Sequence, residues 1–202
     1  MGLYDRYLAT RIRLSERDLP ETVAVVISEH DLLGEGAYET LGDLLEWAFE
    51  FGAETVIVYV SVIGEEAVPT IRRELEAVRS PRSVAVRTRE DETRATDPVQ
   101  ISIGLGGKHE FATAVRKIAE EVKAGRLDPD QITQDDIEGQ LVFPTAPDLV
   151  IKTGAERLSD FMIWQSVYSE LYFTDVNWQN FRRRDYLRAL RDFQDRQRRF
   201  GS

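Results

Sequence analysis

The stretch Asp148-Leu-Val-Ile-Lys-Thr-Gly-Ala-Glu-Arg-Leu-Ser159 decides how this chain is expected to fold. Its first five residues form a short apolar run typical of a buried strand, and the rest is a turn crowded with hydrogen-bond donors. In α/β proteins, the turn after the carboxyl end of a strand often holds an anion. The stretch therefore predicts a strand that ends at a phosphate or diphosphate site, with Lys152, Arg157 and Ser159 as ligands.

A simpler interpretation of the same turn needs no ligand. Ser159 or Asp160 can cap a helix that follows, expected over residues 160–170, and Arg157 can point into solvent. Both interpretations place a strand before the turn and a helix after it. They differ only in whether the donors of the turn face an anion.

Upstream of this stretch, apolar runs of strand length alternate with helical patterns. The strands are expected at residues 22–28, 55–61, 83–88 and 99–104, and the helices at residues 3–14, 38–51, 69–78 and 109–124. In the last of these helices, Phe111, Val115, Ile118 and Val122 share the face expected to point inward. Strands that alternate with helices form a largely parallel sheet. The sequence thus predicts a single α/β domain, residues 1–202, with helices on the faces of the sheet.

Composition excludes several classes of protein. The chain has no cysteine and two histidines, which leaves no disulfide and argues against a zinc site. Its net charge of −10 argues against binding to nucleic acid, because phosphate backbones attract a basic face. No apolar run is long enough to span a bilayer, and the first residues lack the features of a signal peptide. We therefore expect a cytoplasmic protein, with any membrane contact peripheral, through a polyprenyl product or the helical segment near Tyr4.

The choice of basic residues carries a further signal. Only four of the 26 basic residues are lysines, and the surface is acidic overall. An acidic, lysine-poor surface suits a salt-rich cytoplasm, where ions screen the repulsion between carboxylates. The composition therefore indicates a halophilic source.

The C-terminal half resembles a known family. After Ser159 the chain continues as Asp-Phe-Met-Ile-Trp-Gln-Ser-Val-Tyr-Ser-Glu-Leu-Tyr-Phe-Thr-Asp-Val-Asn-Trp178, and it closes with Arg198-Arg-Phe-Gly201. Upstream, Gly104-Leu-Gly-Gly-Lys-His-Glu-Phe111 is similar to a Gly-Gly-Arg-x-Glu motif. These segments resemble the cis-prenyltransferases, the undecaprenyl and polyprenyl diphosphate synthases. The resemblance implies a dimeric protein that binds isopentenyl diphosphate at Lys152, Arg157 and Ser159.

The N-terminal half departs from the pattern of that family. Active members carry an aspartate that holds Mg²⁺, and the resemblance places Ser28 there, whose neutral hydroxyl is a poor metal ligand. Between Ser28 and Glu46 there is no Arg or Lys, but there are five acids, which repel a diphosphate. We therefore expect no allylic substrate and no metal here. The alternatives are Glu29 or Asp31 as a replacement metal ligand, and His30 as an acid–base group.

This selective loss resembles the partner subunit of two-component cis-prenyltransferases, of which the Nogo-B receptor type is an example. The resemblance implies a subunit that is inactive alone and an active homologue that binds Mg²⁺. Together they would condense isopentenyl diphosphate onto an allylic prenyl diphosphate to make a dolichol-type polyprenyl diphosphate. Arg199 and the backbone of Gly201 are expected to act in trans at the diphosphate site of the partner. The alternative is that the basic helix end complements only its own dipole.

An aromatic-rich segment after the turn is expected to form the interface with that partner. The candidates are Trp164, Tyr168, Tyr172, Phe173 and Trp178. Such a stretch is also typical of an ordinary core, and a buried interface is built in the same way. Glu170 matches a glutamate that lies near the metal in the family, but without an aspartate at position 28 we assign it no metal.

Three functions follow from these patterns. The first is a non-catalytic subunit of a heteromeric cis-prenyltransferase. The second is a self-sufficient homodimeric synthase. The third is a degenerate isoprenoid-binding module without a catalytic partner.

Overall fold

The computed structural model describes residues 2–154 and 160–200, the last four of these by their backbone alone. Six strands of the described chain form one sheet in the order β3-β4-β2-β1-β5-β6, and all five neighbouring pairs are parallel. The strands are β1 Thr22–Ser28, β2 Thr55–Ser61, β3 Val84–Thr88, β4 Val99–Ile103, β5 Leu149–Thr153 and β6 Glu170–Thr174. The predicted α/β class with a parallel sheet is confirmed.

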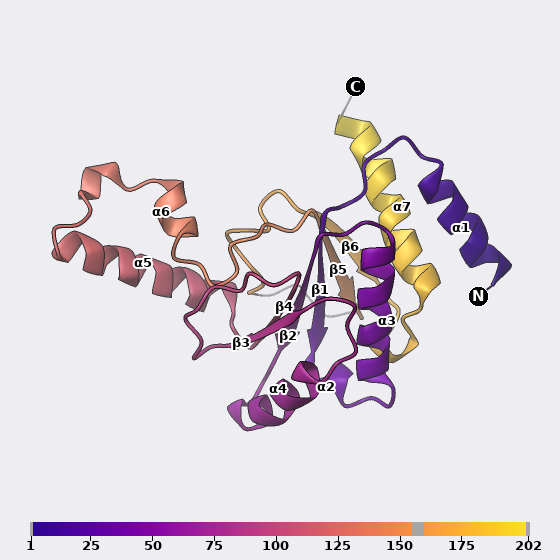
Figure 1. Ribbon diagram of the computed structural model, residues 1–202, viewed down its shortest axis with the longest axis horizontal. Coiled ribbons are helices and arrows are strands. Elements are labelled where there is room, and N and C mark those ends of the chain that lie inside the picture. Colours follow the sequence, from indigo (N-terminus) through magenta and orange to yellow (C-terminus); the bar gives the residue numbers. More distant parts are fainter. Residues whose placement is uncertain (1, 155–159, 201–202) are drawn as a thin grey trace.

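Helices cover one face of this sheet (Figure 1). The helices are α1 Leu3–Arg13, α2 Glu29–Leu32, α3 Ala37–Glu50, α4 Val68–Glu76, α5 Gly107–Lys123, α6 Gln134–Glu138 and α7 Arg183–Phe200, and 3-10 turns lie at Glu65–Ala67, Pro129–Gln131 and Trp178–Asn180. Apolar side chains of α3, α4 and α7 share one core with the strand residues that point to their face. Helix α1 packs on the outer side of α7 and buries Leu8 and Ile12 there.

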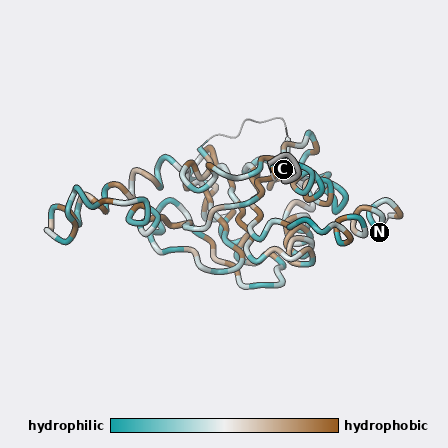
Figure 2. The backbone as a smooth tube through the Cα atoms, turned by 90° about the horizontal axis from the view of Figure 1, so that it is seen from above, coloured by the Kyte–Doolittle hydropathy of each residue, from teal (hydrophilic) through white to brown (hydrophobic). Residues whose placement is uncertain are grey.

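The opposite face of the sheet is covered mainly by irregular segments. Val26 and Tyr59 of this face pack with Phe143, Phe161 and Met162 in a second core. Helices α5 and α6 project away from the sheet as an arm, which Figures 1 and 2 show from two directions. Hydrophobic stretches gather at the centre of the molecule in Figure 2, whereas the arm and the helices near the termini are more hydrophilic.

Two local predictions are wrong. No helix follows Asp160: residues 163–168 form turns, and strand β6 begins at Glu170, because the Glu170 N–H donates to the Asp148 carbonyl (2.8 Å) and pairing with β5 continues from there. In α5 the buried face holds Glu110, Ala114 and Ile118, whereas Val115 is exposed. Hydrogen bonds to the Glu110 carboxylate turn that face inward.

The topology places a switch point at the carboxyl ends of β1 and β5. From β1 the chain passes through α2 and α3 to β2, on one side of β1. Strand β5 lies on the other side of β1 and is reached after α5 and α6, away from the face that α3 covers. Such a switch point between neighbouring parallel strands is where open α/β sheets bind ligands.

Candidate functional site

Polar side chains meet at this switch point on one face of the sheet. Val26 of β1 is in register with Tyr59 of β2 and with Lys152 of β5, so these three side chains form a row across the sheet. Ser28 lies two residues further along β1 and points to the same face. The carboxyl ends of these strands therefore bring a lysine, a tyrosine and a serine to the same face of the sheet.

Lys152 is a buried cation without a counter-ion in the described structure. Its side chain belongs to a residue that is only 4% exposed, and its Nζ donates to the Thr153 carbonyl at 2.7 Å. Within residues 2–154 and 160–196, no carboxylate forms an ion pair with it. Burying an unpaired ammonium costs several kcal/mol, so the position calls for an anion.

The amino end of α5 lies against residues 160–163 and is already capped. Asp160 accepts hydrogen bonds from the backbone of Lys108 (Oδ1, 2.8 Å) and of Gly107 (carbonyl oxygen, 2.6 Å). A Cβ at Gly107 would lie 2.6 Å from the Ile163 backbone nitrogen, so only glycine permits this approach. Asp160 thus caps α5 rather than a helix of its own. Its carboxylate meets the positive end of the α5 dipole, so that helix end is already occupied by a negative charge.

The backbone after the turn is strained. Asp160 has φ 56° and Met162 has φ 31°, both in the left-handed region that non-glycine residues seldom adopt. Strain of this kind persists where the surroundings fix the chain, and it gathers at functional sites. Here the hydrogen bonds of Asp160 to α5 hold the strained backbone in place.

Tyr59 supplies a neutral hydroxyl in the same row as Lys152, with Val26 between the two. Burial raises the pKa of its phenol, the nearby Asp160 carboxylate raises that pKa further, and Arg89 opposes both. The Phe161 ring packs edge-on against the Tyr59 ring, with 5.5 Å between centroids. Tyr59 therefore stays protonated at neutral pH and can donate a hydrogen bond to a phosphate oxygen.

The carboxyl end of β1 holds a carboxylate despite lacking an aspartate at position 28. Ser28 caps α2, and Asp31 Oδ2 accepts hydrogen bonds from both the backbone N and the Oγ of Ser28, each at 2.8 Å. One oxygen of Glu29, Oε2, is buried and has no hydrogen-bond partner in the described residues. From the sequence, Ser28 indicated loss of the metal-binding aspartate, and Asp31 was only an alternative ligand. A Ser-x-x-Asp capping box was the signal that could have favoured Asp31.

These oxygens suit a hard divalent cation. Mg²⁺ prefers oxygen ligands and is commonly held by one or two carboxylates together with the phosphates of a substrate. Asp31 and Glu29 meet that description, and the orphaned Glu29 oxygen fits it in particular. The described residues contain no cluster of three or more acidic or histidine side chains that would hold a metal without a substrate.

The other predicted ligands fall partly outside the described chain. Arg157, Ser159 and Gly201 lie outside the described residues, and Arg199 lies in the last turn of α7 with only its backbone described. Glu170 begins β6, at the opposite edge of the sheet, where its Oε2 lies 3.2 Å from a guanidinium nitrogen of Arg196.

The five interface candidates lie in different environments. Tyr168 is 98% exposed, Phe173 is exposed and Tyr172 is half-buried. Trp164 is half-buried and stacks on Phe111 of the α5 arm, with 5.6 Å between ring centroids. Trp178 is fully buried, and its Nε1 donates to the Ala37 carbonyl at 3.0 Å. Its assignment to an interface is therefore wrong, because core packing leaves it no surface to offer a partner.

Comparison with known proteins identifies the relatives of this chain. The family profile described as "Putative undecaprenyl diphosphate synthase" matches residues 60–201. A tritrans,polycis-undecaprenyl-diphosphate synthase (geranylgeranyl-diphosphate specific) of Methanocaldococcus jannaschii is 33% identical over 251 positions, which cover 100% of this chain and 89% of the relative. An enzyme of the same name from Methanopyrus kandleri is 41% identical over 164 positions, 80% of this chain and 60% of the relative.

Solved structures share the fold at lower identity. Lavandulyl diphosphate synthase from Lavandula x intermedia matches with a TM-score of 0.71 and 22% identity, over 87% of this chain and 95% of that one. A probable undecaprenyl diphosphate synthase from Campylobacter jejuni matches with a TM-score of 0.65 and 20% identity, over 92% and 100%. At these identities the likeness concerns the fold.

Proposed function

Because this chain belongs to the cis-prenyltransferase family, we propose that it takes part in condensing isopentenyl diphosphate with an allylic prenyl diphosphate to give a polyprenyl diphosphate. The observation that carries this proposal is the buried, uncompensated ammonium of Lys152 at the switch point. A diphosphate would supply the missing negative charge. Arg157 and Ser159 of the adjoining turn are the further ligands that we propose for isopentenyl diphosphate.

The residues of the site have separate tasks in this reaction. Lys152 binds the diphosphate as a point charge, and the Tyr59 hydroxyl orients a phosphate oxygen next to it. Asp31 and Glu29 would hold Mg²⁺ at the end of β1. When bound, Mg²⁺ neutralises the charge of a departing diphosphate. Asp160 keeps the amino end of α5 and the strained turn in position around these groups.

The first candidate for the whole protein is a self-sufficient, homodimeric polyprenyl diphosphate synthase. The relatives that align along most of this chain are named as undecaprenyl-diphosphate synthases. The carboxylate of Asp31, hydrogen-bonded to Ser28, is the replacement metal ligand that we propose at the end of β1. These two observations favour catalysis over our first expectation of an inactive subunit.

The second candidate is the accessory subunit of a heteromeric enzyme. Between Ser28 at the end of β1 and Glu46 in α3 there are five acids but no arginine or lysine, which disfavours an allylic diphosphate there. The alignment to the Methanocaldococcus enzyme has 251 positions and this chain has 202 residues. At the remaining 49 positions, the relative has residues that this chain lacks. In this reading an active homologue binds Mg²⁺ and the allylic substrate.

Both candidates use the C-terminal tail in trans. Helix α7 has 18 residues, which gives a length of about 27 Å. It runs away from the carboxyl edge, since Figure 1 shows its end opposite the tip of β1 and since Arg196 near that end pairs with Glu170 at the first residue of β6. We propose that Arg199 and the Gly201 backbone therefore serve the diphosphate site of a neighbouring subunit. The interface we propose uses Trp164, Tyr168, Tyr172 and Phe173.

Incorporation of labelled isopentenyl diphosphate onto geranylgeranyl diphosphate with Mg²⁺ tests these candidates. The chain would be assayed alone and then mixed with a homologue from the same source that carries an aspartate at the position of Ser28. Turnover by the chain alone, lost on Lys152→Met, supports the synthase. Turnover only in the mixture, lost on Arg199→Ala of this chain, supports the accessory subunit. If neither assay shows turnover but the chain still binds isopentenyl diphosphate, the result supports the isoprenoid-binding module.

We also propose that the protein is adapted to high salt. The acidic, lysine-poor composition supports this, because screening by ions relieves repulsion between surface carboxylates. Unfolding followed by circular dichroism in decreasing salt is the test. Full stability in dilute buffer would remove the proposal.

A further inference from the structure

The charge of this chain is distributed very unevenly. Residues 2–18 and 181–202 together hold 12 basic and 6 acidic residues, a net charge of +6. Residues 19–180 hold 14 basic and 30 acidic residues, a net charge of −16. The two terminal segments form α1 and α7, which pack on each other at one end of the molecule. The protein therefore has one basic face on an acidic body.

Helix α1 adds an exposed apolar stripe to this basic face. Its inner face buries Leu8 and Ile12 against α7. At 100° per residue, Leu3, Tyr7 and Leu14 lie within about 40° of one another on the side of the helix away from that contact. Leu3 is 88% exposed and Leu14 is 78% exposed. Exposed apolar side chains that gather on one face of a helix, rather than being scattered singly, are typical of an interaction site.

Arginines flank the stripe along its whole length. The Arg11 guanidinium lies over the Tyr7 ring, 5.7 Å from its centroid, and that of Arg188 lies over the Tyr4 ring at 5.6 Å. Arg184 borders a hollow that Leu3 and Tyr4 line from the other side. Arg11 donates to the Tyr7 hydroxyl at 3.1 Å and has no carboxylate partner among the described residues.

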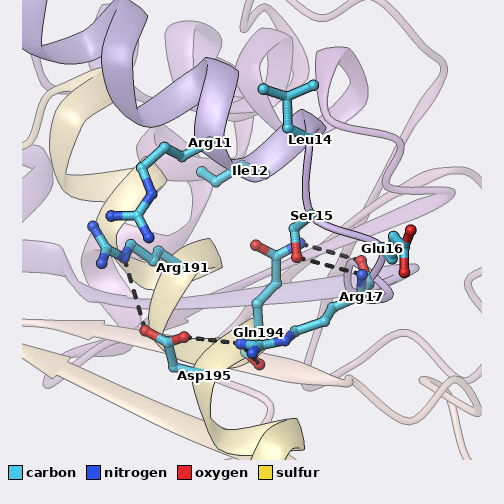
Figure 3. A pocket seen from close by; sticks show the side chains of 9 residues that line it. All are labelled: Arg11, Ile12, Leu14, Ser15, Glu16, Arg17, Arg191, Gln194 and Asp195. Atoms are coloured by element: carbon cyan, nitrogen blue, oxygen red, sulfur yellow. Dashed lines mark hydrogen bonds and ion pairs between the residues drawn. The ribbon is translucent and has the colours of Figure 1, made fainter.

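A groove continues this surface between the end of α1 and α7 (Figure 3). It has a volume of about 1130 Å³, and Arg11, Arg17 and Arg191 all line it. One carboxylate, that of Asp195, serves two of these arginines, with Arg17 at 2.9 Å and Arg191 at 3.7 Å. Glu16 is the second carboxylate of the lining, so three arginines stand against two carboxylates, and exposed Leu14 lies in the same groove.

We propose that the face formed by α1 and α7 docks this protein onto an anionic membrane surface. Leucine and tyrosine side chains enter the boundary between headgroups and acyl chains, and arginines beside them contact lipid phosphates. The acidic body then points away from the bilayer, because the same surface potential repels it. Leu3 and Leu14 favour hydrocarbon over nucleic acid, since an aliphatic side chain cannot stack on bases as an aromatic ring does. The described helices contain none that could cross a membrane, so this contact lies on the surface.

Vesicle flotation tests this inference on the full-length chain. Phosphatidylcholine vesicles would be compared with vesicles that also contain phosphatidylglycerol, at the lowest salt that leaves the circular dichroism spectrum unchanged. We expect flotation with the mixed vesicles and little with phosphatidylcholine alone. Each arginine near an anionic surface contributes about a fivefold factor, so Arg11→Gln with Arg184→Gln should weaken flotation by roughly tenfold or more. Arg11→Lys with Arg184→Lys keeps the charge and should retain it.

Matched pairs of variants separate the apolar contribution from a general effect. Leu3→Ser with Leu14→Ser should lower flotation by about tenfold, because two exposed apolar side chains leave the bilayer boundary. Ile63→Ser with Val167→Ser changes two exposed apolar residues elsewhere and should have no effect. Equal loss in both pairs would overturn the inference. Absence of flotation with both kinds of vesicle would also overturn it. If a co-purified protein were then lost from the Leu3→Ser, Leu14→Ser variant, the face would be assigned to that protein.

Discussion

The two strand ends that meet at the switch point carry opposite charges for opposite reasons. At the end of β5, Lys152 is buried and its charge has no counter-ion in the described structure. At the end of β1, Asp31 is tied to Ser28 by two hydrogen bonds of 2.8 Å, and acids surround it. The first end can bind an anion as it stands. The second can hold a cation, or an anion through a cation, and needs positive charge from Mg²⁺ or from a neighbouring subunit.

The largest effect is expected at the β5 end. Lys152→Met keeps the length of the side chain and removes its charge, so binding of isopentenyl diphosphate should fall by at least about a hundredfold, the worth of a buried charge–charge contact. The free energy of unfolding should rise by roughly 1 kcal/mol, because a buried unpaired cation is replaced by an apolar group. Calorimetric titration and urea unfolding measure the two quantities.

Weaker ligand binding together with higher stability of the fold is a combination that is specific to a ligand site. If Lys152 served only the fold, its substitution would lower the free energy of unfolding of the protein and leave its affinity for the diphosphate unchanged. Lys123→Met on α5 is the matched control, because Lys123 lies in the last turn of the projecting arm. That control should change neither quantity appreciably.

The next prediction tests the acidic end. Asp31→Asn retains the shape of the cap and removes the negative charge. If Asp31 holds Mg²⁺, turnover by the chain alone should fall about a hundredfold, and the half-saturating Mg²⁺ concentration should rise. Glu35→Gln changes another acid of the same region and is the control. If a mixture of the Asp31→Asn chain with an active homologue turned over as fast as before, the metal site would be assigned to that homologue.

The sequence predicted the fold well because its signal is local. Each predicted strand among residues 22–104 is present within a residue or two of its expected ends, since buried parallel strands are continuous apolar runs. The segment after Asp160 was mispredicted because pairing of β6 with β5 outweighs its helical pattern. That pairing is a long-range contact, which local periodicity cannot show.

The site was predicted less completely than the fold. Lys152 could be assigned from its place at the end of an apolar run. The role of Asp160 could not, because its hydrogen bonds reach α5, which lies 52 residues earlier in the chain. Trp178 shows the same limit: an aromatic residue in a family motif gives no indication of whether it faces the core or a partner, and here it faces the core.

A smaller effect is expected at the proposed interface between two subunits. Tyr168→Glu places a charge at a 98% exposed position of the proposed interface. The dimer dissociation constant should rise by roughly tenfold, since a charge at an apolar contact must be desolvated. Sedimentation velocity over a concentration series measures it. Ile63→Glu, at another exposed site, should leave the constant unchanged, and an equal shift in both variants would remove Tyr168 from the interface.

The smallest predicted effect concerns a buried charge that, unlike Lys152, has its partners. Glu110 accepts hydrogen bonds from the Phe143 backbone N–H at 2.8 Å and from Gln165 Nε2 at 3.1 Å. Burial still raises the pKa of its carboxyl above the ordinary value, and the hydrogen bonds oppose that rise. The folded state therefore binds this proton more tightly than the unfolded state does. The contribution of Glu110 to stability must fall as pH rises from the unfolded pKa through the folded one.

Glu110→Gln should remove that contribution, because an amide does not titrate in this range. The difference in free energy of unfolding between the wild-type chain and the variant should therefore change with pH above about 4.5, in the direction of a relatively less stable wild type as pH rises. Urea unfolding at a series of pH values measures the difference and cancels the carboxylates common to both chains. A difference that stays constant with pH would mean that hydrogen bonds fully offset burial at Glu110. The contrast with Lys152 would then be sharper still, because burial of the Glu110 carboxylate would carry no net cost, whereas Lys152 has no counter-ion in the described structure.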